Sequence, residues 1–161
     1  MRLFYYLFIT FILISCSNNV ELIFDEDNGG LFLPTGFQSL VVHEGVGQSR
    51  HIAVNDNGDI YVKLRLDYGR RGNVALRDKN GDGKADIIQR FGDYPNDGRF
   101  ATEMKINEGY LYYSSERVVY RQKLSSKKLI PNSPVEVILT DPFPIRWHNA
   151  KSIAFDKENN M

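Results

Sequence analysis

The stretch that decides the fold is residues 51–64, which reads HIAVNDNGDIYVKL. Two short runs containing β-branched and aromatic residues, 51–54 and 60–64, flank a turn at residues 55–59. The turn consists of Asn, Asp and Gly, which tolerate the positive φ angles that tight hairpins require. The sequence therefore predicts a β-hairpin here.

The same pattern recurs further along the chain. Residues 104–113 repeat it with a shorter turn, and residues 152–160 begin it a third time. Ala53, Lys105 and Ala154 occupy equivalent positions, so the steps are 52 and 49 residues. A period near 50 residues, built from short strands and turns, is typical of the blades of a β-propeller. We therefore predict an all-β fold and a β-propeller, the alternative being another all-β chain with similar hairpins.

About two and a half such repeats fit into the chain, whereas four to eight blades close a ring. Matching Ala53 with Ala154 places Met161 opposite Ile60, the first residue of the second hairpin strand. We therefore expect residues 31–161 to be the N-terminal part of a propeller domain in a longer protein. Additional short strands are expected within residues 17–33 and at residues 38–42.

Composition excludes several classes of protein. The 161 residues carry 20 Lys and Arg against 20 Asp and Glu, so the net charge is zero. This balance argues against a polybasic nucleic-acid binder, and no nucleic-acid partner is predicted. The single Cys excludes a disulfide framework and a Cys-based zinc site. The 10 Phe and 9 Tyr favour strands over a helical bundle.

The N-terminus has the pattern of a targeting segment. Residues 3–14 are apolar except for Thr10, a run too short to span a membrane but suited to a secretory signal. The run ends in Leu13-Ile14-Ser15-Cys16, which looks like a bacterial lipobox. The alternative is an ordinary signal peptide followed by a chance Cys.

The lipobox predicts a signal peptide at residues 1–15, acylation of Cys16 and a lipid-anchored linker at residues 16–30. Acyl chains would then tie the protein to a membrane without a protein span. The predicted location is the bacterial cell envelope, on the periplasmic or cell-surface side.

A calcium loop is predicted at residues 78–86, which read DKNGDGKAD. Alternating oxygen-bearing side chains suit calcium, which takes six to eight oxygen ligands. Position twelve is Gln89 and not the bidentate Glu of an EF-hand, so the loop resembles those of propeller hairpins. The alternative is an acidic turn without metal. The predicted ligands are Asp78, Asn80, Asp82, the backbone carbonyl of Lys84, and Asp86.

Two polar residues precede expected inner strands by the same distance. His148 lies five residues before Ile153, and Arg99 lies five residues before Met104. In a propeller such positions face the mouth of the central channel, so both side chains are expected at one pocket. His148 is a candidate general base because imidazole titrates near neutral pH. The alternative is a histidine held by backbone hydrogen bonds beside Trp147.

The chain resembles the glucose/sorbosone dehydrogenase family over roughly residues 31–161. The resemblance rests on Leu33–Phe37, Arg50–Val54, Asn57–Val62, Asp78–Asp86 with Arg90–Gly92, and Gly109–Tyr112. It implies a six-bladed β-propeller that oxidises a sugar or related alcohol with pyrroloquinoline quinone.

The resemblance also assigns roles to residues. It implies that His148 takes the proton of the substrate hydroxyl while hydride moves to the quinone, and that Arg99 contributes to the cofactor pocket. The predicted function is therefore that of the N-terminal part of a lipid-anchored, quinone-dependent sugar or alcohol dehydrogenase, inactive as this chain alone. Its electron acceptor is not specified by the sequence. The alternatives are a non-catalytic, calcium-stiffened propeller that binds carbohydrate or protein, and a gene fragment without function.

Overall fold

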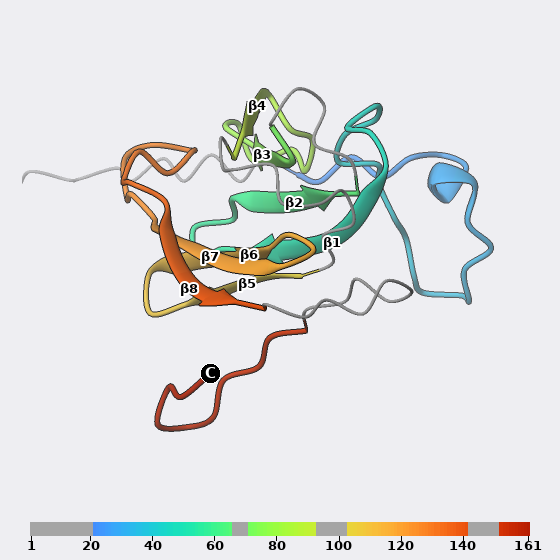
Figure 1. Cartoon of the computed structure of the whole chain (residues 1–161). Coiled ribbons are helices and arrows are strands. Elements are labelled where there is room, and N and C mark those ends of the chain that lie inside the picture. Colours follow the sequence, from blue (N-terminus) through green and yellow to red (C-terminus); the bar gives the residue numbers. More distant parts are fainter. Residues whose placement is uncertain (1–20, 66–70, 93–102, 142–151) are drawn as a thin grey trace, which may run out of the picture.

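The computed structural model describes residues 21–65, 71–92, 103–141 and 152–161 (Figure 1). These ranges contain eight β-strands and one short 3-10 helix, η1 (Asn28–Gly30), which confirms the all-β prediction. Within them, no helix has the length and apolar character needed to cross a membrane. The strands are β1 (Ser49–Val54), β2 (Ile60–Leu64), β3 (Asn73–Arg77), β4 (Ile87–Phe91), β5 (Met104–Asn107), β6 (Tyr110–Ser114), β7 (Val118–Lys123) and β8 (Glu136–Thr140).

The strands form two four-stranded antiparallel sheets in the orders β1-β2-β3-β4 and β5-β6-β7-β8. Each strand pairs with its sequence neighbour, so both sheets are simple meanders. The two predicted hairpins are present: Ala53 pairs with Tyr61 in the first, and Lys105 pairs with Tyr112 in the second. The positions matched by the sequence repeat therefore occupy the same place in each sheet.

The third copy of the repeat keeps the turn but not the strand. In the first copy, Asn55 N–H donates to the Asp59 carbonyl at 2.9 Å; in the third, Asp156 N–H donates to the Asn160 carbonyl at 3.0 Å. The residue that needs a positive φ angle is Gly58 in one turn (+87°) and Asn159 in the other (+65°). Residues 152–155, expected to form a strand, are irregular because no described segment pairs with them.

The strands expected within residues 17–33 and at residues 38–42 do not form among the residues described there. One backbone hydrogen bond joins the two segments, from Asp25 N–H to the Ser39 carbonyl at 3.1 Å, and side chains take two further N–H groups. Val41 N–H donates to Asp25 Oδ2 at 2.5 Å, and Ser39 N–H donates to Asn28 Oδ1 at 3.1 Å. We call residues 21–46 the N-terminal strap; near its end, Val42 and Val46 pack on the first sheet.

The main core lies between the two sheets. Tyr61, Ala75 and Phe91 of the first sheet pack in one buried cluster with Met104 and other residues of the second sheet. Strands β1 and β2 contact β5, and the two sheets face each other across this cluster. The remaining buried members of the cluster are Leu111, Tyr113, Val118, Tyr120 and Leu129.

Each sheet also has an outward face. Val42 and Val46 of the strap cover part of the first sheet's outward face, which is built from Val62, Leu64, Val74 and Leu76. Ile153 and Phe155 cover the second sheet at Tyr112 and Val119. The packing order is therefore strap, first sheet, second sheet, and the start of the third repeat.

Tyr61 provides a pH-dependent test of this packing. Its side chain is fully buried and its hydroxyl donates to the Leu129 carbonyl at 2.9 Å. Burial, and next the charge of Asp59, raise the pKa of Tyr61 to about 12, above the usual tyrosine value near 10. The folded state therefore retains this proton more tightly than the unfolded state, and its contribution to stability falls as pH rises from about 10 to about 12.

We expect Tyr61→Phe to lower the free energy of unfolding by about 0.5–1.5 kcal/mol at pH 8, because one buried hydrogen bond is lost. Above pH 10 the difference from the wild type should shrink, since only the wild type must retain a proton there. Denaturant unfolding of both proteins at several pH values measures this. A constant difference up to pH 12 would contradict the burial of Tyr61.

Candidate functional site

The β3–β4 connection contains the predicted calcium loop, and hydrogen bonds within the loop determine its shape. The Asp78 carboxylate accepts from the backbone N–H groups of Asn80 (3.1 Å), Gly81 (2.6 Å) and Gly83 (2.7 Å). At the other end, Asp86 Oδ2 accepts from Lys79 N–H at 2.7 Å. The carboxylates of Asp78 and Asp86 therefore hold the loop in a tight turn through hydrogen bonds to its own backbone.

Asp82 occupies the middle of the loop. Its carboxylate accepts from the Lys84 backbone N–H (2.8 Å) and from the Asn80 side-chain amide (3.0 Å). These two hydrogen bonds, together with the Lys84 charge, lower the pKa of Asp82. The carboxylate is therefore ionised at neutral pH, the form that binds a metal.

The loop offers only oxygen donors of the kind calcium prefers, and a carboxylate has about four acceptor positions, more than these hydrogen bonds use. In this respect the residue types fit calcium. However, no three His, Cys, Asp or Glu side chains come together as a metal-binding group in the described part of the chain. Calcium would therefore have to draw the loop carboxylates closer together.

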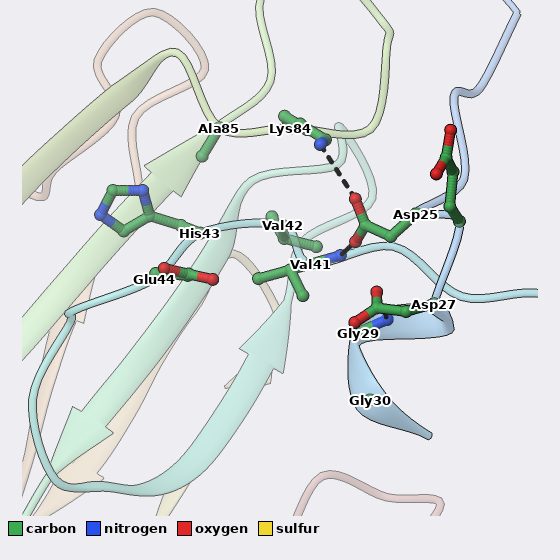
Figure 2. A pocket seen from close by; sticks show the side chains of 11 residues that line it. Asp25, Asp27, Gly29, Gly30, Val41, Val42, His43, Glu44, Lys84 and Ala85 are labelled. Atoms are coloured by element: carbon green, nitrogen blue, oxygen red, sulfur yellow. Dashed lines mark hydrogen bonds and ion pairs between the residues drawn. The ribbon is translucent and has the colours of Figure 1, made fainter. Parts of the chain in front are cut away.

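The loop is docked on the N-terminal strap. Ala85 N–H donates to the Val42 carbonyl at 2.9 Å, and Lys84 Nζ lies 3.1 Å from Asp25 Oδ1 (Figure 2). The Asp25 carboxylate accepts hydrogen bonds from Val41 N–H and from Lys84. Both lower the pKa of Asp25, the bond from Val41 the more strongly. Gly83 has φ +90°, and a Cβ there would lie 2.6 Å from Leu40 Cδ2, so the close approach requires glycine.

An open pocket of about 690 Å³ lies between the strap and this loop (Figure 2). Its walls are mostly polar, and four carboxylates outnumber a single lysine. The charged and titratable lining residues are Asp25, Glu26, Asp27, His43, Glu44 and Lys84. The described lining is therefore rich in carboxylates, one of which, Asp25, pairs with Lys84.

Sequence reasoning missed a buried carboxylate, Glu103, directly before β5. Its side chain is 8% exposed and lies 3.1 Å from Nε2 of His51, the third residue of β1. The other carboxylate oxygen accepts from Ile153 N–H at 3.2 Å. Glu103 therefore links the starts of the first, second and third repeats. The repeat itself contained the signal, because His51, Glu103 and Ser152 are equivalent positions.

A second polar feature lies beside it, on the face between the sheets. Lys63 pairs with His51 on one side and with Asn73 on the other, and both Lys63 and Asn73 are buried. Lys63 Nζ donates to the Gly72 carbonyl at 3.2 Å. The Asn73 amide has no hydrogen-bond partner among the described residues. His51, Lys63 and Asn73 therefore form a row of polar side chains across β1, β2 and β3.

The predicted catalytic residue His148, the cofactor residue Arg99 and the lipidation site Cys16 all lie outside the described residues. Of the other two histidines, His43 is exposed at the rim of the acidic pocket, and His51 pairs with Glu103.

Comparisons with protein-family models, with curated proteins and with solved structures find no match to this chain.

We expect Glu103→Ala to lower the free energy of unfolding by about 1–3 kcal/mol, because the buried Ile153 N–H loses its acceptor. Glu158→Ala is the matched control: Glu158 is exposed and close to the same repeat, so its loss should change stability by less than about 0.5 kcal/mol. Denaturant melts of the two variants test this. Equal effects would show that Glu103 does not link the repeats.

Proposed function

We propose that this chain is the N-terminal part of a β-propeller, and that the complete protein is a lipid-anchored, quinone-dependent sugar or alcohol dehydrogenase. The observation that supports the proposal most strongly is the repeat of one packing unit. A four-stranded meander packs face to face on the next, and the turn of a third copy follows. Blades of this construction are the units of propellers.

The enzymatic part of the proposal rests on the resemblance to glucose/sorbosone dehydrogenases. The motifs that carry this resemblance include the first hairpin, formed by β1 and β2, and the loop 78–86, which connects β3 and β4. In this proposal His148 accepts the substrate hydroxyl proton, and Arg99 contributes to the cofactor pocket. Bound pyrroloquinoline quinone would supply the hydride acceptor. Cys16 would carry the acyl chains that hold the protein at the cell envelope.

A second candidate function is a non-catalytic propeller that binds carbohydrate or protein. The docking of the loop 78–86 on the N-terminal strap favours it. Calcium in this loop would fix both the β3–β4 hairpin and the strap, which is a structural role. It involves no group that could act on a substrate.

The two candidates differ in what His148 does. We expect His148→Ala in the complete protein to lower kcat by about 10²–10⁴-fold, the usual contribution of a positioned general base. His148→Gln should lose as much, because an amide cannot take up the proton. Quinone-dependent dye reduction and thermal melting of the same preparations measure this. Normal turnover in a folded His148→Ala protein would leave the binding module as the better candidate.

Calcium in the loop has its own test. A ligand that binds only the folded form stabilises it by about 2.7 kcal/mol at a hundredfold excess over Kd. Calcium should therefore raise the Tm of the wild type, and Asp82→Ala should remove most of that rise. Asp56→Ala, at an exposed aspartate in the first hairpin turn, should retain the full response. A wild-type Tm that is the same in calcium and in chelator would contradict the site.

A further inference from the structure

An uncharged loop projects from the N-terminal strap. Residues 28–42 contain no Asp, Glu, Lys or Arg, although these types make up 25% of the chain. Figure 1 shows the segment after η1 as a blue loop that runs out beyond the sheets and returns to them. We call residues 29–38 the apolar loop, because its large side chains face water. The exposed fractions are 57% for Leu31, 105% for Phe32, 36% for Leu33 and 67% for Phe37.

Hydrogen bonds close the base of the apolar loop. Ser39 N–H donates to Asn28 Oδ1 at 3.1 Å, and Ser39 Oγ donates to the Asn28 carbonyl at 2.6 Å. Next to them, Asp25 N–H donates to the Ser39 carbonyl at 3.1 Å. Gly29 has φ +61°, and a Cβ there would lie 2.9 Å from Val41 Cγ2, so the base requires a glycine. A compact loop whose ends are held together in this way is an Ω-loop, a type that is frequently functional.

The exposed side chains of the apolar loop do not stabilise the fold. None of the four belongs to a buried cluster of the described chain. Single apolar residues at a protein surface are ordinary, but several that gather in one projecting loop mark an interaction site. The loop is therefore built to meet an apolar partner.

The place of the loop in the chain points to a membrane as that partner. Cys16, the predicted acylation site, lies five residues before Glu21, where the described strap begins. Even when fully extended, five residues span at most about 18 Å. An acylated Cys16 would therefore keep the strap next to the surface of the bilayer.

The charges near the loop indicate how it would bind. Asp25, Glu26 and Asp27 lie directly before the uncharged segment. Carboxylates at this place oppose attraction to anionic lipid headgroups, so contact with the membrane would depend on the apolar side chains. Binding of this kind is weakly sensitive to salt, because screening acts only on charges.

We infer that the apolar loop inserts into the interfacial region of the bilayer and thereby fixes the orientation of the protein on the membrane. Exposed Phe and Leu side chains of peripheral proteins bind at the boundary between headgroups and acyl chains. The inference rests on the lipid anchor proposed above and not on dehydrogenase activity. Phe32 is the most exposed side chain of the loop and is expected to enter the bilayer.

Lipid-borne quenching of a fluorescent probe tests the insertion. Phe32→Cys and the control Val137→Cys each carry bimane in the complete, acylated protein, where acylation blocks the Cys16 thiol. Val137, on β8, is 59% exposed and far along the chain from the loop. The proteins are placed in vesicles of phosphatidylethanolamine and phosphatidylglycerol that contain doxyl-labelled phosphatidylcholine.

We expect the doxyl lipid to quench the probe at position 32 about fivefold more strongly than the probe at position 137, at low and at high salt. Equal quenching at the two positions would overturn the inference. A probe at position 32 that is shielded from aqueous iodide but not quenched by the doxyl lipid would also overturn it, because another part of the protein would then cover the loop.

A second tether separates failure of the anchor from failure of the loop. The same two variants are made in a Cys16→Ser background, with a histidine tag in place of residues 1–15, and are bound to nickel-chelating lipid. This tether does not depend on acylation, so stronger quenching at position 32 would support the loop even if Cys16 carried no lipid. Equal quenching under this tether would overturn the inference whatever the state of Cys16.

Discussion

The structure depends on one packing contact that is used twice: the second strand of each sheet places a tyrosine against the beginning of the next repeat. Tyr61 does this toward Met104, and Tyr112 does it toward Ile153 and Phe155. A single meander cannot bury both of its faces, so each sheet needs a neighbour to form a core. The repeat in the sequence is therefore also a repeat of interfaces.

Polar groups are placed where this stacking leaves room for them. Glu103 lies where the first, second and third repeats come together, and it pairs with His51 and with the Ile153 backbone. On the opposite side of the first sheet, the loop 78–86 does not face the core but holds the N-terminal strap through Lys84 and Asp25. The first sheet thus contacts two polar sites. At one, the buried Glu103 joins the repeats; at the other, Lys84 pairs with Asp25 at the surface.

The sequence was informative where structure is local. The Asn-Asp-Gly turn at residues 55–59 and its flanking strands predicted the first hairpin, because turn chemistry and strand propensity act within a few residues. The prediction of a strand at residues 38–42 was wrong, because Asp25 and Asn28 take backbone hydrogen bonds there. Glu103 was missed for a similar reason: its partners lie about 50 residues away on either side, and no local pattern indicates them. The loop 78–86 was placed correctly between two strands, whereas its ligand set remains a prediction.

The central claim is that each repeat packs on the one before it through equivalent positions. A double-mutant cycle between Tyr112 and Phe155 tests this most directly, because the two rings lie in different repeats and meet edge to face. The unfolding free energies of Tyr112→Leu, Phe155→Leu and the double variant give the coupling energy. The account predicts a favourable coupling of about 0.5–1.5 kcal/mol, typical of aromatic pairs. Strictly additive effects of the two substitutions would contradict it.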